Sequence, residues 1–418
     1  MKVNNKTVGI IVNPNSGKDI RRLVSSAFVV PQQYKSNELI KLYEGLSSQG
    51  VNKVFIMPDF SDVSKRAREK YSNLVDTEIL KTRNLDDEST TIESAKQMNN
   101  LSLDCVIIFG EDVGFFGGVF RVTDTLQQKY GKHRVFDSPL AEGGIAATAF
   151  GMGINGLRPV VEIQFADYIF PAYDQIVNEI AKIRYRSGGE FTTPITFRTP
   201  AGGGIKGGNH HSQSPEAQFT HTPGIKVVYC STPNNAKGLL TAAIESNDPV
   251  IFFEPKRCYR GPFYGDPHNV PTWKGHEKAE VPEDYYKIEL EKAEIVQEGT
   301  DCTVIAWGAM LHVAEAGIKE SGVSCELIDL QTLIPFDKET LVNSVKKTGR
   351  CVIVHEAPKT SGFGAELSAS IQENCFYSLE SPIIRVTGWD TPFPHSTEWD
   401  YLPNPERIAT AIKKTQEE

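Results

Sequence analysis

The chain has 418 residues, of which 39% are hydrophobic and 23% are charged, with 34 glycines and 24 prolines. This composition is typical of a globular protein of two or three domains. The formal net charge of -9 and the pI near 5.6 provide no basic field for a polyanion, so neither nucleic acid nor an anionic membrane surface is an expected partner.

The seven cysteines are scattered, without a C-x-x-C pair or a cysteine-histidine cluster, and this predicts neither disulfides nor structural zinc. The chain passes from Met1 almost directly into a strand-like segment, which leaves no room for a signal peptide or an Arg-rich transit helix. No apolar run approaches the roughly 18 residues that span a bilayer. We therefore expect a cytoplasmic protein, or a mitochondrial-matrix protein without its presequence if the source is eukaryotic.

Strands that alternate with helical stretches predict an α/β fold of parallel sheets flanked by helices. The first block, residues 1–104, contains a predicted strand from Val8 to Val12, a helix from Lys18 and a strand from Val54 to Met57. A charged, Ser/Thr-rich stretch from Arg83 to Ser94 then interrupts the apolar pattern.

A second block covers residues 105–258, a Pro/Gly/His-rich linker covers 259–283, and a third block covers 284–418. The strands predicted in the second block are Val106 to Phe109, Pro159 to Phe165, Ile195 to Arg198, Lys226 to Tyr229 and Val250 to Phe253. The third block has predicted strands at Thr303 to Trp307, Ser324 to Leu330, Cys351 to Glu356 and Ile383 to Thr387, with helices at Val313 to Glu320 and from Ala365.

Three motifs in the second block contain acids, aromatic residues and histidines in a distinctive order: Ser138 to Gly144, Glu162 to Tyr168 and His210 to Glu216. Together with Leu330 to Asp337 in the third block, they make residues 105–418 resemble the beta subunit of the thiamine diphosphate-dependent decarboxylase of branched-chain 2-oxoacid dehydrogenase complexes. The resemblance implies a transketolase-like pyrimidine-binding domain in the second block and a transketolase C-terminal-like domain in the third.

Glu142 lies between the apolar pair Pro139 and Leu140 and a run of small residues that would let a ring approach the backbone. Thiamine diphosphate becomes a nucleophile when a partly buried carboxyl group hydrogen-bonds its pyrimidine ring, and the resemblance favours Glu142 for this role. From the residues alone, a helix-start glutamate stabilised by the helix dipole is the more frequent explanation.

Three further residues receive roles from the resemblance. The family glutamate that matches Glu111 lies near the cofactor glutamate and helps to relay protons between paired active sites. The tyrosine that matches Tyr168 contacts the cofactor, and the histidine that matches His211 is placed for acyl transfer to the lipoyl group. The alternatives are an acid that caps a helix, a core aromatic residue and a structural histidine.

The resemblance also implies a potassium site formed by backbone oxygens. The matching residues are Ile195, Thr196, Ala243, Ile244, Ser246 and Asp248. Main-chain oxygen ligands leave little side-chain pattern. Ser246 and Asp248 stand where related proteins often have Asp and Asn, so the match is incomplete at two positions.

The sequence lacks the G-D-G motif, followed after about twenty-five residues by N-N, that holds Mg²⁺ and the diphosphate in this enzyme class. The resemblance therefore implies an alpha subunit that holds Mg²⁺, in an alpha2-beta2 heterotetramer with the cofactor at the alpha/beta interface. It also implies a lipoylated acyltransferase core as a partner and a small 2-oxoacid as the substrate.

The segment from Val8 to Arg22 resembles the opening of an NAD-kinase-like protein of the kind associated with acetoin catabolism. It is not a P-loop, because Val12 stands where that motif needs glycine. The kinase family's G-G-D-G motif should follow the strand from Val106 to Phe109, where the chain instead reads Gly110, Glu111 and Asp112. We infer a fusion within this strand, with an incomplete kinase-like segment at residues 1–104.

Two classes of function remain open at this point. The favoured one is an oxidoreductase, 3-methyl-2-oxobutanoate dehydrogenase (2-methylpropanoyl-transferring), which acts in branched-chain amino acid catabolism and needs its alpha subunit. A pyruvate or acetoin dehydrogenase beta subunit would differ in substrate only. The other class is an inactive fusion that retains subunit binding or nucleotide binding.

Overall fold

The computed structural model describes residues 6–10, 32–48, 50–56, 64–80, 106–270 and 280–417. The chain divides into two compact units, Met1–Cys105 and Val106–Glu418. The predicted helix from Lys18 and the charged stretch from Arg83 to Ser94 lie outside the described residues.

The first unit contains a three-stranded parallel sheet in the order β1-β2-β3. Its strands are β1 (Lys6–Ile10), β2 (Val51–Ile56) and β3 (Asp76–Ile79), and its helices are α1 (Gln32–Ser48) and α2 (Lys65–Tyr71). A separate core of buried side chains from α1, β2 and α2 includes Tyr43, Ile56 and Tyr71. This unit therefore has a hydrophobic core of its own.

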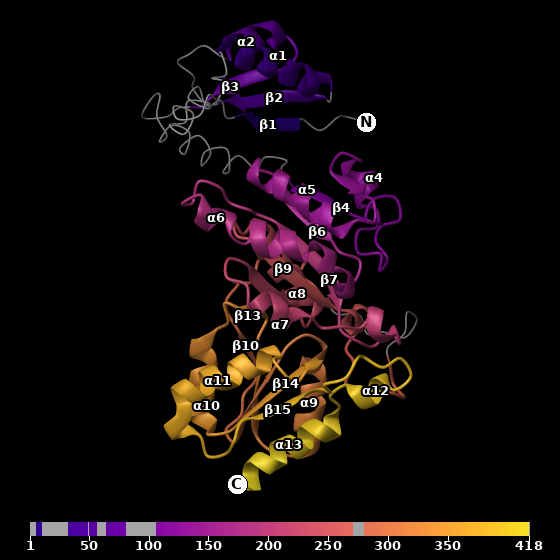
Figure 1. Cartoon of the computed structure of the whole chain (residues 1–418), viewed down its shortest axis with the longest axis vertical. Helices are drawn as coiled ribbons and strands as arrows, with labels where there is room; N and C mark the ends of the chain where they lie inside the picture. The colour runs from indigo at the N-terminus through magenta and orange to yellow at the C-terminus, as the bar shows by residue number, and fades with distance from the viewer. Residues whose placement is uncertain are drawn as a thin grey trace. The chain divides into compact units, whose positions relative to one another are not determined.

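The second unit begins with a seven-stranded sheet in the order β13-β8-β9-β7-β6-β4-β5, parallel except for β13 (Figure 1). The strands are β4 (Val106–Gly110), β5 (Val135–Asp137), β6 (Arg158–Glu162), β7 (Thr196–Ala201), β8 (Lys226–Tyr229), β9 (Val250–Pro255) and β13 (Thr332–Ile334). Its helices are α4 (Leu126–Tyr130), α5 (Glu142–Ile154), α6 (Ile183–Arg186), α7 (Glu216–Thr220) and α8 (Pro233–Glu245), with a π-helix, η4, at Gln175–Ile180.

A five-stranded sheet follows in the order β10-β12-β11-β14-β15, parallel except for β10. Its strands are β10 (Glu294–Gln297), β11 (Cys302–Ala306), β12 (Cys325–Asp329), β14 (Cys351–Pro358) and β15 (Ile384–Gly388). The helices are α9 (Ala309–Ser321), α10 (Lys338–Thr348), α11 (Phe363–Cys375), α12 (Glu398–Tyr401) and α13 (Pro405–Glu417).

The two sheets of the second unit are joined by backbone pairing and by a buried acid. After β12 the chain crosses to the seven-stranded sheet, where β13 pairs with β8. The Asp329 carboxylate at the end of β12 accepts hydrogen bonds from Ser231 Oγ at 2.8 Å and Asn235 Nδ2 at 3.1 Å. One hydrophobic core includes side chains from both sheets, so the sheets form one packed body.

The predicted strand from Pro159 to Phe165 was too long. β6 ends at Glu162, and η2, a 3₁₀ turn at Ala166–Tyr168, follows with Tyr168 N–H donating to Phe165 O at 2.9 Å. The apolar run gave no local signal for the end of the strand, because Phe165 is buried in both the predicted and the observed arrangement. The turn keeps the Glu162 to Tyr168 motif at the carboxyl end of the sheet.

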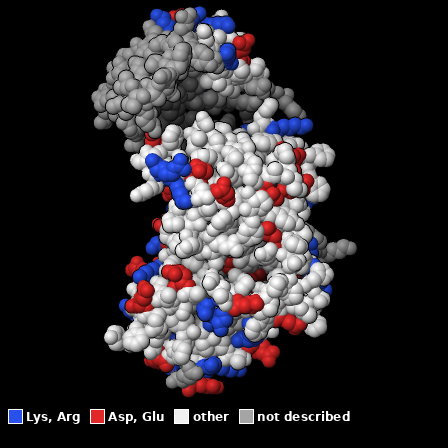
Figure 2. Space-filling view, in the orientation of Figure 1, with Lys and Arg blue, Asp and Glu red and all other residues white. Residues whose placement is uncertain are grey.

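Lys and Arg are interspersed with Asp and Glu on the face shown in Figure 2, where no continuous basic patch gathers. This mixed surface agrees with the net charge of -9. Within the described ranges, no helix combines the length and the apolar character that crossing a membrane would require.

The separate cores predict that the two units unfold as separate transitions. Ile56→Ala removes a fully buried side chain from the first unit, at a cost of about 2–5 kcal/mol, and should lower only one calorimetric transition. The matched change Ile353→Ala on β14 should lower only the other. Equal effects of either change on both transitions would contradict independent unfolding.

Candidate active site

The carboxyl ends of β4 and β5 bring the two predicted acids together. Glu111 follows β4 directly, and Glu142 begins α5, where it is 9% exposed. The carboxyl group of Glu142 acts on Glu111 and raises its pKa, so the two side chains lie within interaction range of each other. A protonated carboxyl group donates a hydrogen bond and an ionised one accepts, so such a pair can present both a donor and an acceptor.

Glu111 has a raised pKa. Burial is the main cause, and together with the carboxyl groups of Glu142 and Asp112 it raises the pKa of Glu111 from 4.5 to about 7. Its Oε1 is buried without a hydrogen-bond partner in the part of the chain that the structure describes. Glu111 can therefore exchange a proton near neutral pH.

Tyr168 and His211 meet beside this pair. The Tyr168 hydroxyl and His211 Nε2 are hydrogen-bonded at 2.7 Å. The Phe165 ring stands edge-on to both side chains, with centroids 4.6 Å from His211 and 5.6 Å from Tyr168. Burial raises the pKa of Tyr168, and the charges of Asp167, Glu111 and Glu142 raise it further, which places the phenol within electrostatic reach of both predicted acids.

Asp167 fixes the segment that carries His211. Its Oδ1 accepts hydrogen bonds from the backbone N–H groups of Ser212 and Gln213, both at 3.2 Å. Its other oxygen, Oδ2, is buried without a partner within the described ranges. Asp167 therefore sets the position of Ser212 and Gln213, the two residues that follow His211.

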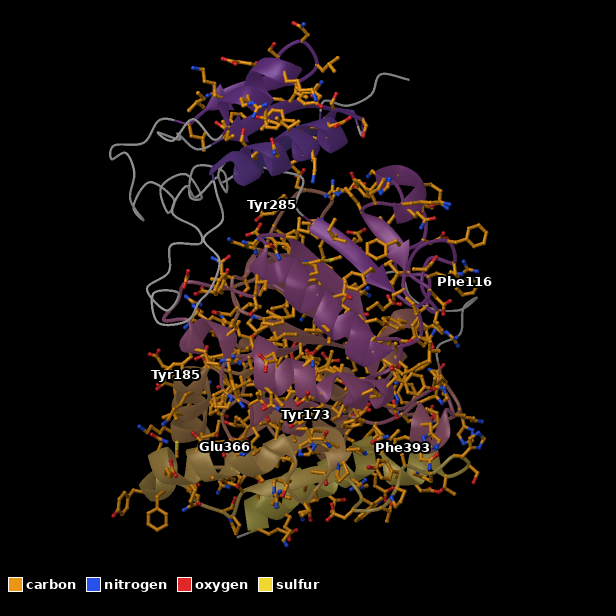
Figure 3. The ribbon with its side chains drawn as sticks, turned by 45° about the horizontal axis from the view of Figure 1, so that its top comes forward. Phe116, Tyr173, Tyr185, Tyr285, Glu366 and Phe393 are labelled. Atoms are coloured by element: carbon orange, nitrogen blue, oxygen red, sulfur yellow. The ribbon has the colours of Figure 1, made fainter. Side chains whose placement is uncertain are left out.

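The C-terminal domain holds the glycine-rich stretch before His211, residues 202–208. Glu356 accepts a hydrogen bond from Gly203 N–H at 3.0 Å, and Glu398 accepts one from Lys206 N–H at 3.2 Å. A Cβ atom at Gly203 would lie 2.7 Å from the ring of Phe393, a C-terminal-domain residue labelled in Figure 3. Glycine permits this close approach, so the His211 segment is held from both domains.

A buried charge network underlies the site on three neighbouring strands. Arg198 on β7 donates to Glu162 on β6 at 3.0 Å and, through two nitrogens, to Glu254 on β9 at 2.7 and 2.9 Å. Tyr259 also donates to Glu254, at 2.5 Å. Burial opposes the guanidinium charge, but Glu254 and Glu162 outweigh it and raise the pKa of Arg198.

The six residues predicted to hold potassium lie around the start of β7 and the end of α8: Ile195, Thr196, Ala243, Ile244, Ser246 and Asp248. The Arg158 guanidinium donates to the main-chain oxygens of Ile244 and Ser246, both at 2.9 Å. The Asp248 carboxylate pairs with Arg184. Arg158 thus occupies one acceptor site on each of the Ile244 and Ser246 oxygens, and potassium binding at the six residues stays a prediction.

The arrangement suits a flat nitrogen heterocycle better than a metal ion. A partly protonated carboxyl pair can hydrogen-bond ring nitrogens, and a cluster of aromatic edges can bury the apolar part of a ring. Among the described residues, no group of three or more histidines, cysteines and acids is placed to hold a metal. The donor set thus fits thiamine diphosphate through its pyrimidine ring.

Comparison with known proteins decides the family. Residues 93–262 match the pyrimidine binding domain of transketolase, and residues 291–408 match its C-terminal domain. The 2-oxoisovalerate dehydrogenase subunit beta of Pseudomonas aeruginosa is 56% identical over 333 residues, which cover 78% of this chain and 95% of that protein. The chain belongs to the family of 2-oxoisovalerate dehydrogenase beta subunits.

Other relatives extend this result. The mitochondrial 2-oxoisovalerate dehydrogenase subunit beta of Dictyostelium discoideum is 55% identical, with 74% of this chain and 80% of that protein covered. The pyruvate dehydrogenase E1 component subunit beta of Acholeplasma laidlawii is 48% identical, with 74% and 91% covered. A solved split gene transketolase, an inactive beta4 tetramer, shares the fold at 19% identity and a TM-score of 0.56, with 77% and 95% covered.

The family and the transketolase-like fold predicted from the motifs are confirmed, and thiamine diphosphate is the cofactor that the pyrimidine-binding domain implies. The roles of Glu111, Glu142, Tyr168 and His211 stay predictions, although the structure places these residues together. The domain boundaries and the NAD-kinase-like resemblance of residues 1–104 also stay predictions.

Sequence reasoning gave no role to several residues that build this site. Four of them are buried charged residues: Arg198, Glu254, Lys256 and Arg257. The fifth is Asp167, which lies within the Glu162 to Tyr168 motif but received no role of its own. A charged residue at or just after the carboxyl end of an apolar strand was the available signal, because that end of a parallel sheet commonly faces the ligand. Glu254 and Lys256 both fit this pattern.

The Arg198 network predicts a large stability effect. Arg198→Met leaves Glu162 and Glu254 buried without their cation, and we expect a loss of about 3–5 kcal/mol in the free energy of unfolding. Arg186→Met breaks an exposed pair with Glu179 and should cost less than about 1 kcal/mol. Chemical denaturation measures both, and a similar small loss in each would show that the buried network is not needed for stability.

The raised pKa of Glu111 predicts a pH-dependent effect on stability. Because its pKa rises from 4.5 to about 7 on folding, the folded chain loses stability as Glu111 ionises between these values. Glu111→Gln should therefore raise the melting temperature at about pH 8 but not below about pH 4.5. Thermal melts without cofactor test this, with the exposed Glu373→Gln on α11 as the control, and an equal effect at both pH values would contradict it.

Proposed function

We propose that this chain is the beta subunit of a thiamine diphosphate-dependent branched-chain 2-oxoacid dehydrogenase. The reaction is oxidative decarboxylation of a branched-chain 2-oxoacid with acyl transfer to a lipoyl group. The observation that carries the proposal is the 56% identity to a 2-oxoisovalerate dehydrogenase subunit beta across 95% of that protein. The interacting carboxyl groups of Glu111 and Glu142 and the hydrogen bond between Tyr168 and His211 give it a physical basis.

Glu142 is the group that hydrogen-bonds the pyrimidine ring in this proposal. It is buried at the first turn of α5, next to the small residues Gly143 and Gly144. Bound thiamine diphosphate supplies the electron sink for decarboxylation. Glu111, which gains and loses a proton near neutral pH, can take up or return a proton as Glu142 changes between accepting and donating a hydrogen bond.

Tyr168 and His211 serve the second half of the reaction. The 2.7 Å hydrogen bond orients the imidazole through its Nε2 atom, and the Phe165 edge limits its rotation. A histidine held in this way can donate a proton to the acceptor during acyl transfer. The charges of Glu111 and Glu142 also act on Tyr168, so a ring bound beside these acids can contact it.

The proposed assembly is an alpha2-beta2 heterotetramer in which an alpha subunit holds Mg²⁺ and the diphosphate. A lipoylated acyltransferase core is the proposed acceptor partner. The relatives include bacterial and mitochondrial proteins. We propose a cytoplasmic location in a bacterium, or the mitochondrial matrix in a eukaryote.

Pyruvate is the second candidate substrate, because a pyruvate dehydrogenase beta subunit is 48% identical to this chain. The identity is lower than the 56% and 55% shared with two 2-oxoisovalerate dehydrogenase subunits. Acetoin is a third candidate substrate, because an acetoin dehydrogenase beta subunit would differ from the proposed enzyme in substrate only.

For residues 1–104 we propose an incomplete NAD-kinase-like segment joined to the dehydrogenase subunit. The described part is a parallel β-α-β unit with three strands, which suits a fragment of a larger nucleotide-binding sheet. The kinase motif after the Val106 to Phe109 strand is replaced by Gly110, Glu111 and Asp112. We expect no NAD phosphorylation by the full chain, and a purified chain that phosphorylates NAD would overturn the fusion proposal.

The decisive experiment measures dye-coupled decarboxylation by the chain assembled with a branched-chain-type alpha subunit, with 2-oxoisovalerate or pyruvate as the substrate. Glu142→Gln should lower turnover by about 10²- to 10⁴-fold, because an amide cannot exchange the proton. Glu320→Gln, an exposed change on α9, is the matched control and should leave turnover unchanged.

Faster turnover of 2-oxoisovalerate than of pyruvate would support the branched-chain substrate, and the reverse would favour the pyruvate alternative. A stable complex without turnover would favour the inactive fusion. Full activity of Glu142→Gln would remove this residue from the reaction.

A further inference from the structure

Lys256 is a buried amine for which the proposed chemistry has no use. It begins the short helix η6 (Lys256–Arg260) directly after β9, at the carboxyl end of the seven-stranded sheet. The residue is 3% exposed, and its Nζ atom has no hydrogen-bond partner among the described residues. An unpaired buried charge is costly, so its retention at this edge calls for a compensating role.

The surroundings of Lys256 belong to the site. Its Nζ lies 5.5 Å from the centroid of the Phe165 ring, which is within cation–π range. Burial lowers the pKa of Lys256 to about 8, and the carboxylates of Asp167, Glu356 and Glu398 act in the opposite direction. The ammonium therefore lies within electrostatic reach of three acids that come from three different elements.

Each of these neighbours contacts His211 or the segment around it. Phe165 meets the His211 ring edge-on at 4.6 Å. Asp167 holds the two backbone N–H groups after His211, while Glu356 and Glu398 hold two N–H groups in the glycine-rich stretch before it. One cation thus lies near the four side chains that hold the His211 segment in place. We call these side chains its anchors: Phe165, Asp167, Glu356 and Glu398.

The other cation on η6 does not duplicate Lys256. The charges of Glu356 and Glu398 also act on the Arg257 guanidinium. Its Cζ atom, however, lies over two aromatic rings, 4.6 Å from the Phe263 centroid and 4.8 Å from the Trp399 centroid. Asp167 is the strongest of the charges that act on Lys256, whereas Glu356 is the strongest of those that act on Arg257. Lys256 therefore links the Asp167 anchor to the two anchors of the C-terminal domain.

We propose that the Lys256 ammonium is a positioning group for His211. It attracts Asp167, Glu356 and Glu398 from within the protein and lies against Phe165, so that His211 keeps its place during acyl transfer to a lipoyl group. The inference rests on the proposed function, in which His211 acts at that step. A displacement of about 1 Å at a reacting group can lower a rate by about 10²-fold, so loss of this cation should be measurable.

The test compares two rates in the complex with an alpha subunit: dye reduction, which follows decarboxylation, and acylation of a lipoyl domain. We expect Lys256→Met to lower acylation by at least about tenfold and dye reduction by less than about twofold. Lys256→Arg keeps the charge and should restore most of the acylation rate. Lys319→Met removes an exposed lysine on α9 and should change neither rate.

The pH profile separates a charge effect from a packing effect. Wild-type acylation should fall above about pH 8 as Lys256 loses its proton, and Lys256→Arg should lack this fall because arginine stays protonated. Normal acylation by Lys256→Met, or an equal loss of both rates together with a lower melting temperature, would overturn the proposal. A wild-type complex that reduces no dye would instead overturn the proposed function, and this inference with it.

Discussion

The arrangement of the site depends on one buried guanidinium. Arg198, in the middle of β7, pairs with Glu162 and Glu254 on the two adjacent strands, and these ion pairs offset the cost of burying its charge. This pairing fixes the relative register of β6, β7 and β9 at the edge where the ligand is expected. The Glu162 to Tyr168 motif begins in this network, and the cations Lys256 and Arg257 follow shortly after Glu254. The network therefore sets where both segments leave the sheet.

The site contains two pairs of side chains that can exchange protons, Glu111 with Glu142 and Tyr168 with His211. Glu111 and Glu142 lie within interaction range, and the pKa of Glu111 rises to about 7, so this pair suits proton exchange with a heterocyclic ring. Tyr168 and His211 form a second pair that has its own hydrogen bond and its own aromatic wall. The division matches the two stages of the proposed reaction, decarboxylation and acyl transfer.

The C-terminal domain contributes to the site as well as to the fold. Glu356 and Glu398, both in this domain, hold the backbone on the N-terminal side of His211. β13 crosses into the seven-stranded sheet, and Asp329 accepts hydrogen bonds from Ser231 and Asn235. These contacts hold the two domains in a fixed position relative to each other. The position of His211 therefore depends on packing between domains.

The sequence by itself determined the alternating α/β pattern, the strand Lys226 to Tyr229 and the family, because strand periodicity and short motifs are local properties. It also named Glu111, Glu142, Tyr168 and His211, which the structure brings together. Only the tertiary structure decided where β6 ends, that β13 joins another sheet, and that Arg198 and Lys256 face acids from distant segments. The physical reason is that a buried charge is stabilised by partners far away in the chain, and no local pattern records which partners the folded chain brings near.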